Sequence, residues 1–234
     1  MSPLTITLRL ALLAFASPCA LHAQGGLPDA AFEAGRYDEA ARLLTEAIAK
    51  DSGRAGLWQQ RARARREAGA FDLAIADYST ALQLDPTLAP AYVGRAATRH
   101  RMQQPDSALA DIGRARALGF ADPQVDLLEG MSLVAAGRSR EAVPVLDRFV
   151  KASPEAAAGW YFRGLARSAT RDDKGAVRDF DEAIARGMPG PEPYVFRAQS
   201  KFRAGDGKGA CTDLAAAGER GDEASITTAT QYCR

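Results

Sequence analysis

The chain has 234 residues, of which 47% are hydrophobic and 25% are charged, the proportions of an ordinary globular protein. Its 30 Lys and Arg residues balance 29 Asp and Glu residues, which argues against a general nucleic-acid binder, because such proteins usually carry a strong basic excess. Aromatic residues make up only 7% and alanine is abundant, a composition that suits closely packed helices.

The N-terminus has the three-part plan of a secretory signal peptide, which we place at residues 1–23. Arg9 precedes the short apolar run LALLAFASPCAL, and Ala23 is a small residue at the expected cleavage point. We expect cleavage after Ala23 and a periplasmic or secreted protein with no integral membrane span. An uncleaved anchor is the alternative, although the run is short for a membrane span. Lipid attachment at Cys19 is not expected, because Pro18 occupies the place of the small residue that a lipobox needs.

A pattern of residue types then recurs every 34 residues. Its clearest copy, Trp58 to Pro86, predicts two amphipathic helices joined at Gly69. Gly35, Gly137 and Gly205 fall at the same turn. We call the residues that occupy one position of the 34-residue repeat a column. Three further columns hold small residues (Ala62, Ala96, Gly130, Gly164, Ala198), alanine (Ala40, Ala74, Ala108, Ala142, Ala176, Ala210) and bulky residues (Leu44, Tyr78, Ile112, Leu146, Phe180, Leu214).

This pattern resembles the tetratricopeptide repeat over residues 27–221. The resemblance implies an all-α fold, a right-handed α-solenoid of stacked antiparallel helix pairs with a C-terminal capping helix. A generic alanine-rich bundle is the alternative, but it would not keep a fixed register. We divide the domain, residues 24–234, into a partial repeat 27–54, full repeats 55–88, 89–122, 123–156, 157–190 and 191–221, and a capping helix 222–234.

Two charged columns occur together in the repeats. Arginine in the first helix accompanies aspartate in the second, whereas repeat 123–156 has Glu129 and Val145 at these places. Such pairs form forked hydrogen bonds, so we interpret them as structural rather than catalytic, within one repeat or between neighbours. The residues are Arg61, Arg95, Arg163 and Arg197, with Asp77, Asp111, Asp179 and Asp213.

Repeat 123–156 departs from the pattern in other ways. Asp126 replaces the aromatic residue that the other full repeats carry, and Pro144 lies inside a predicted helix, where it is expected to cause a bend. Both a functional role and drift in a tolerant repeat are consistent with these departures.

The C-terminal residues 222–234 predict one more helix, which would cover the end of the solenoid. Cys211 and Cys233 then lie at matching heights on antiparallel helices. In an exported chain we expect them to form a disulfide, with two buried free thiols as the alternative.

The sequence offers few groups for catalysis. His100 is the only histidine after the signal peptide, so neither a Ser/His/Asp arrangement nor a histidine-containing metal cluster is indicated. We therefore expect no enzymatic activity, no metal and no cofactor.

The resemblance implies that the first helices line a concave groove that holds a protein or peptide. The groove would be basic at its N-terminal end and apolar later, and would suit a ligand with the opposite character. We predict a scaffold or adaptor in envelope assembly or secretion; a structural, self-associating protein is the alternative. The lysine and asparagine clamp of some cytosolic members is not matched. The candidate residues are Arg63, Arg66, His100, Arg101, Leu127, Met131, Val134, Tyr161, Leu165, Val195 and Phe202.

Overall fold

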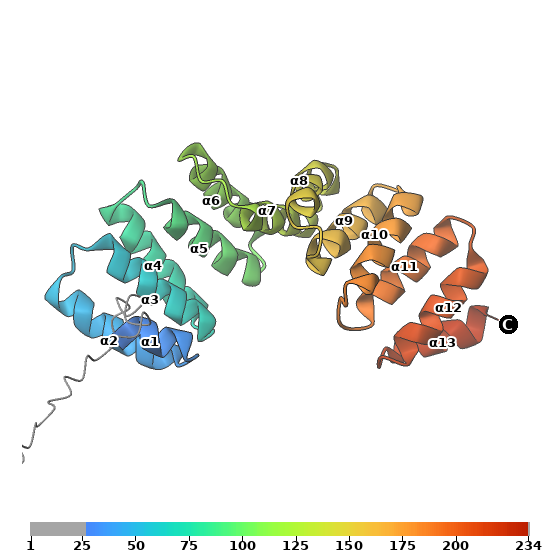
Figure 1. The fold of residues 1–234 in the computed structure, drawn as a ribbon, viewed down its shortest axis with the longest axis horizontal. Helices are drawn as coiled ribbons and strands as arrows, with labels where there is room; N and C mark the ends of the chain where they lie inside the picture. The colour runs from blue at the N-terminus through green and yellow to red at the C-terminus, as the bar shows by residue number, and fades with distance from the viewer. Residues whose placement is uncertain (1–26, 234) are drawn as a thin grey trace, which may run out of the picture.

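A computed structural model describes residues 27–233 of the chain, and within this range all regular structure is α-helical (Figure 1). The predicted signal peptide lies outside the described residues. The helices are α1 (Leu27–Glu33), α2 (Tyr37–Lys50), α3 (Ala55–Glu67), α4 (Phe71–Leu84), α5 (Ala89–Arg101), α6 (Pro105–Ala117), α7 (Pro123–Ala135), α8 (Ser139–Ala152), α9 (Ala157–Ala169), α10 (Asp173–Ala185), α11 (Glu192–Arg203), α12 (Gly207–Gly218) and α13 (Glu223–Tyr232).

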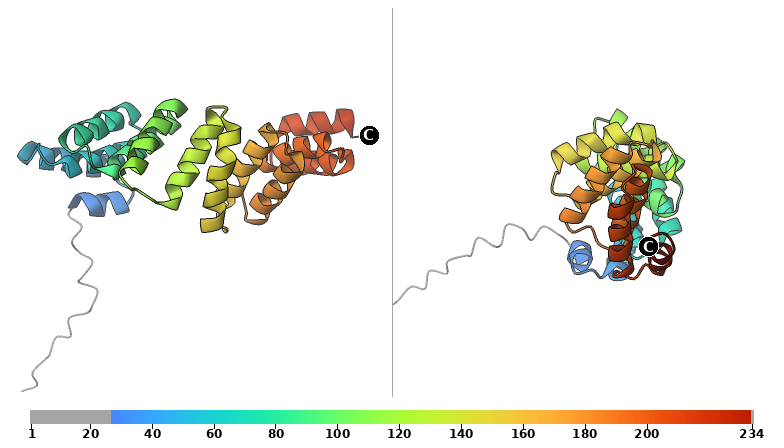
Figure 2. Two further views of the ribbon diagram at one scale, coloured as in Figure 1. Left: turned by 90° about the horizontal axis from the view of Figure 1, so that it is seen from above. Right: turned by 90° about the vertical axis from the view of Figure 1, so that its right-hand side faces the viewer.

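The helices stack in antiparallel pairs to form an arch, with α1 and α2 at one end and α12 and α13 at the other (Figure 1). Each helix packs on the next, and the first helices of successive pairs, α3, α5, α7, α9 and α11, also contact one another. This closer approach places the first helices on the inner side of the arch, while α6 and α8 lie along its outer edge. Seen from above, the molecule is elongated (Figure 2). The predicted all-α solenoid is confirmed.

The core alternates small and large side chains, as the columns predict. Tyr78, Ile112, Leu146 and Phe180 are each at most 1% exposed. A Cβ atom added to Gly130 would lie 2.4 Å from a methyl carbon of Leu146. Small residues are therefore required where the two helices of a pair meet, since a packed interior leaves no room for extra atoms.

The turn inside each pair contains a residue in the left-handed conformation. Gly69 has a φ of +81°, and Gly35, Gly137 and Gly205 adopt the same conformation. Gln103 (+57°) and Arg171 (+68°) occupy the corresponding places in the other two pairs. The geometry of the turn is therefore kept even where the side chain makes it unfavourable.

Candidate protein-binding groove

The candidate groove residues lie on α3, α5, α7, α9 and α11, the helices of the inner face. Several of them serve contacts between neighbouring first helices. The Nδ1 atom of His100 lies 3.1 Å from the Oγ atom of the buried Ser132 on the next first helix. Val134 of α7 likewise packs against a core cluster that includes Ala166 of α9, the next first helix. These residues join repeats and present only part of their surface to the groove.

The basic end keeps two exposed cations. The Arg63 guanidinium lies 3.9 Å from the ring centroid of Phe32, and that of Arg101 lies 4.7 Å from the ring centroid of Phe71. Stacking on a ring positions a guanidinium without neutralising its charge. Arg66, in contrast, is half-buried and donates to the Glu67 carboxylate over 2.6 Å.

In the middle of the candidate groove, Tyr161 is buried and the other apolar candidates are half-buried. Tyr161 is only 9% exposed, and its ring lies 6.1 Å from Phe180 and 6.2 Å from Phe196. Burial, together with the nearby charge of Glu192, raises the pKa of Tyr161 to about 12. Leu165 packs against the same cluster. Leu127 packs against the neighbouring cluster, and Met131 is half-buried. Tyr161 therefore contributes chiefly to packing. The helical spacing from which the candidates were predicted does not distinguish groove positions from the adjoining core positions.

The most open apolar part of the groove lies at its C-terminal end. Val195, Gln199 and Phe202 of α11 line a cavity of about 240 Å³, and Phe202 is 39% exposed. The opposite wall comes from α13, including Ser225 and Thr228. The repeat pattern gave no signal for this wall, since α13 lies beyond the last repeat.

The predicted pairing of arginine and aspartate is confirmed. The Arg61 Nε and Nη2 atoms each donate to Asp77 over 2.8 Å, and Nη1 donates to Thr45 Oγ1 in the preceding pair over 3.0 Å. The Arg61–Asp77 pair thus lies within one repeat, and the third hydrogen bond of Arg61 reaches the preceding repeat. The other units repeat this arrangement, with Arg95 bonded to Asp111 and Ser79, Arg163 to Asp179 and Asp147, and Arg197 to Asp213 and Asp181.

Each of these guanidiniums also stacks on the aromatic residue three positions earlier. The distance from the Arg61 guanidinium carbon to the Trp58 ring centroid is 4.8 Å, and that from Arg163 to Trp160 is 4.7 Å. Arg95 and Arg197 lie over Tyr92 and Tyr194. Aromatic residue, arginine and aspartate therefore form one unit, which explains why repeat 123–156 replaces all three.

In repeat 123–156 the charges are reversed. Asp126 and Glu129 accept hydrogen bonds from Arg116 of the preceding repeat, at 2.5 Å and 2.7 Å, and Arg148 also donates to Asp126. Helix α8 continues from Ser139 to Ala152 through Pro144, which is exposed. The departures thus come with a separate ion network rather than with loss of the helix pair.

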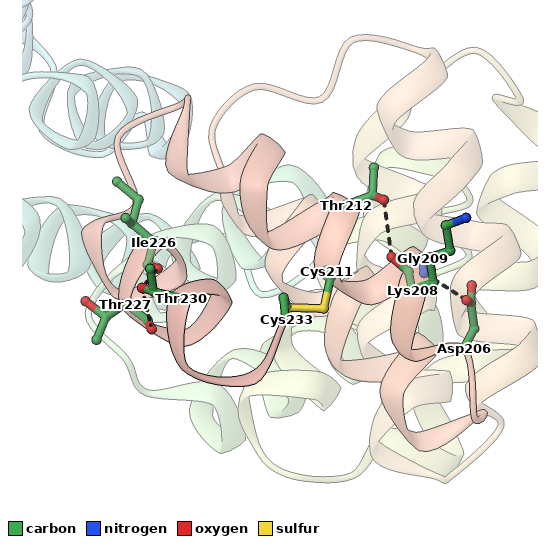
Figure 3. Close-up of a disulfide and its surroundings, with 9 residues drawn as sticks. All are labelled: Asp206, Lys208, Gly209, Cys211, Thr212, Ile226, Thr227, Thr230 and Cys233. Atoms are coloured by element: carbon green, nitrogen blue, oxygen red, sulfur yellow. Dashed lines mark hydrogen bonds between the residues drawn. A yellow bond between two sulfur atoms is a disulfide. The ribbon is translucent and has the colours of Figure 1, made fainter.

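At the C-terminal end, a disulfide joins Cys211 of α12 to Cys233, directly after α13 (Figure 3). Their Cα atoms are 5.6 Å apart, inside the usual range for bonded cysteines. Asp206 caps α12 by accepting from the Gly209 amide, as drawn in Figure 3.

Within residues 27–233, no group of three or more His, Cys, Asp or Glu side chains is arranged to hold a metal ion. None of the helices in this part of the chain has the length and apolar character needed to cross a membrane. Burial lowers the pKa of His100.

Geometry and sequence together define a solenoid of helical repeats whose inner face is built from first helices. Family models for the tetratricopeptide repeat match residues 62–103 and 127–191. The chain is a tetratricopeptide repeat protein, as the resemblance implied.

Solved structures share this fold at low sequence identity. PilW, a widely conserved type IV pilus biogenesis factor, has a TM-score of 0.73 and 17% identity, covering 86% of this chain and 94% of PilW. YrrB, described as a tetratricopeptide repeat protein with an unusual peptide-binding site, has a TM-score of 0.70 and 19% identity, covering 82% of this chain and 99% of YrrB.

Two curated relatives are longer than this chain. Protein FlbA of Caulobacter vibrioides is 28% identical over 186 residues, which are 77% of this chain and 30% of FlbA. The SGT1 homolog of Oryza sativa subsp. japonica is 26% identical over 203 residues, covering 72% of this chain and 55% of the homolog. The chain thus spans 30% and 55% of the length of these relatives.

Proposed function

We propose that this protein is an exported, non-enzymatic scaffold that holds a segment of a partner protein against its first helices. The observation that carries the proposal is the asymmetry of the inner face. Arg63 and Arg101 present cations at one end, while Val195 and Phe202 line an apolar cavity at the other. A segment with acidic groups at one end and an apolar side chain at the other would complement both.

The comparisons support the class of role. YrrB is described as having a peptide-binding site, and PilW as a pilus biogenesis factor. Together with the signal-peptide pattern of residues 1–23, they favour a role in envelope assembly or secretion. We propose cleavage after Ala23 and a periplasmic or secreted location on the basis of that pattern alone.

Self-association through the same face is the alternative. It would make the apolar cavity at Phe202 an interface between two copies, since exposed apolar patches commonly mark interaction sites. Light scattering after size-exclusion chromatography distinguishes the two, because only the alternative predicts a tight homodimer that a charge at Phe202 disrupts.

Photo-crosslinking in cells that make the protein tests the proposal. A photoreactive amino acid at Met131 or Phe202 is expected to capture a partner protein. The same amino acid at Leu73, which is 53% exposed on the second helix α4, is the matched control and should capture little. Equal capture from all three positions, or capture of a second copy only, would overturn the groove assignment.

A further inference from the structure

A pocket of about 570 Å³ lies on the side of the second helices, between α6 and α8, with α7 contributing to its lining. It belongs to repeat 123–156, the repeat that lacks the arginine–aspartate pair. The first-helix residues that reach it, Glu129 and Leu133, are the counterparts of Arg61 and Arg65 in repeat 55–88. With a rotation of about 100° per residue, the Arg61 and Arg63 columns lie on different sides of a first helix. The pocket is therefore separate from the groove.

The pocket occurs where other repeats place a guanidinium. In repeat 55–88, Arg61 and Arg65 both bond Asp77, and Arg61 also bonds Thr45. The four corresponding positions here read Glu129, Leu133, Val145 and Gly113, and all four line the pocket. Loss of the internal cations and their acceptors thus leaves a space of the kind that an arginine side chain fills elsewhere in the chain.

The lining combines apolar walls with carboxylates that retain free acceptor positions. Leu133 and Val145 are 4% and 7% exposed, and they supply apolar surface. Glu129 receives both of its hydrogen bonds from Arg116 on Oε2, which leaves Oε1 free among the described residues. Asp106, also in the lining, accepts no side-chain hydrogen bond within residues 27–233.

Of the four charged residues of the lining, Arg138 and Glu141 cancel each other. Arg138 donates to both oxygens of Glu141. The remaining charge comes from Asp106, which is close enough to Arg138 to help Glu141 raise its pKa but accepts no hydrogen bond from it, and from Glu129, which Arg116 bonds. The pocket thus favours a cation with an apolar stem.

We infer that this pocket accepts an arginine side chain from a partner protein. The methylene stem would lie on Leu133 and Val145, and the guanidinium would donate to Asp106 and Glu129. A guanidinium fits better than an ammonium group because it is planar, more weakly hydrated and able to bond two carboxylates at once. The contact would add a second attachment point on the face opposite the groove.

Titration of the isotopically labelled full chain with N-acetyl-arginine amide, followed by NMR, tests this inference. The amide signals of Gly113, Leu133 and Val145 are expected to shift. The citrulline analogue has the same shape without the charge and should bind at least about tenfold more weakly, a difference of about 1.4 kcal/mol. Equal binding of the two probes, or shifts confined to other helices, would overturn the inference.

Two variants sharpen the test. Glu129→Arg with Val145→Asp copies Arg61 and Asp77 of repeat 55–88 into this repeat, and Arg116→Leu gives the preceding repeat the residue that repeat 55–88 has in that column, Leu82. This triple variant should abolish the response by filling the pocket internally. Asp106→Asn changes an exposed residue, so the fold should persist while arginine amide binds at least about tenfold more weakly. Unchanged binding in Asp106→Asn, or in a folded triple variant, contradicts the assignment. A homodimer that arginine amide dissociates would also contradict it, because the occupant would then be a second copy.

Discussion

Arg61 and Asp77, sixteen residues apart, are joined by two hydrogen bonds of 2.8 Å that link the two helices of one repeat. The third donor of Arg61 reaches Thr45 of the preceding pair. The same side chain therefore fixes the geometry within a repeat and the stacking between repeats. In a solenoid, stability depends on such nearest-neighbour contacts.

Asp179→Leu is expected to lower the free energy of unfolding by about 3–5 kcal/mol, because the buried Arg163 loses the carboxylate that accepts two of its three hydrogen bonds. Urea unfolding followed by circular dichroism measures the change. Glu39→Gln breaks the exposed pair with Arg36 and should cost less than about 1 kcal/mol. Similar losses in the two variants would argue against the structural role of the buried pairs.

Arg171→Gly and Gln103→Gly are each expected to stabilise the protein by up to about 1 kcal/mol. Both residues adopt a positive φ, which costs a side-chain-bearing residue about 1–2 kcal/mol, partly offset by the greater flexibility of glycine when unfolded. Gly137→Ala, at a φ of +72°, should destabilise instead. Thermal melts of the three variants compare the effects, and a stabilising Gly137→Ala would be inconsistent with the turn geometry.

His100 should make the protein less stable at mildly acidic pH. Its folded pKa is lowered by burial, so the unfolded chain binds the proton more readily. Stability is therefore fully present above the unfolded pKa of about 6.5 and declines as the pH falls from there through the lowered folded pKa. Urea unfolding at pH 7.5 and pH 5.5 tests this against His100→Gln, in which the part of the decline due to this residue should disappear. An identical decline in the variant would exclude His100 as its source.

Removal of the Cys211–Cys233 bridge should loosen α13 selectively. The bridge spans 22 residues, for which the chain-entropy relation gives about 3 kcal/mol. Because the loop is terminal, the loss should appear locally. Hydrogen exchange with and without reductant is expected to accelerate in α13 and to stay unchanged in α3. Mass spectrometry of the non-reduced protein that finds both thiols open to alkylation would contradict the bridge.

The 34-residue period made the fold predictable, because residue size at fixed columns specifies where helices touch. Gly130 and Leu146 illustrate this, since one must be small for the other to fit. Arginine and aspartate occur in the same repeats, and this co-occurrence likewise predicted that the two side chains form a pair.

The surface was harder to predict, for physical reasons that particular residues show. Tyr161 occupies a groove column but is buried by Phe180 and Phe196, because neighbouring aromatic residues fill the space around it. The bond from Arg61 to Thr45 depends on the stacking of successive repeats, which a column of residue types does not specify. The α13 wall of the Phe202 cavity lies outside the repeat altogether.

The affinity of the captured partner for the protein is the sharpest test of binding in the groove. Once the partner is identified by crosslinking, calorimetry would compare the unaltered protein with Phe202→Glu and with Leu73→Glu, both exposed positions. Binding in the groove predicts at least about tenfold weaker affinity for Phe202→Glu and no change for Leu73→Glu. Equal affinity for all three proteins would contradict binding in the groove.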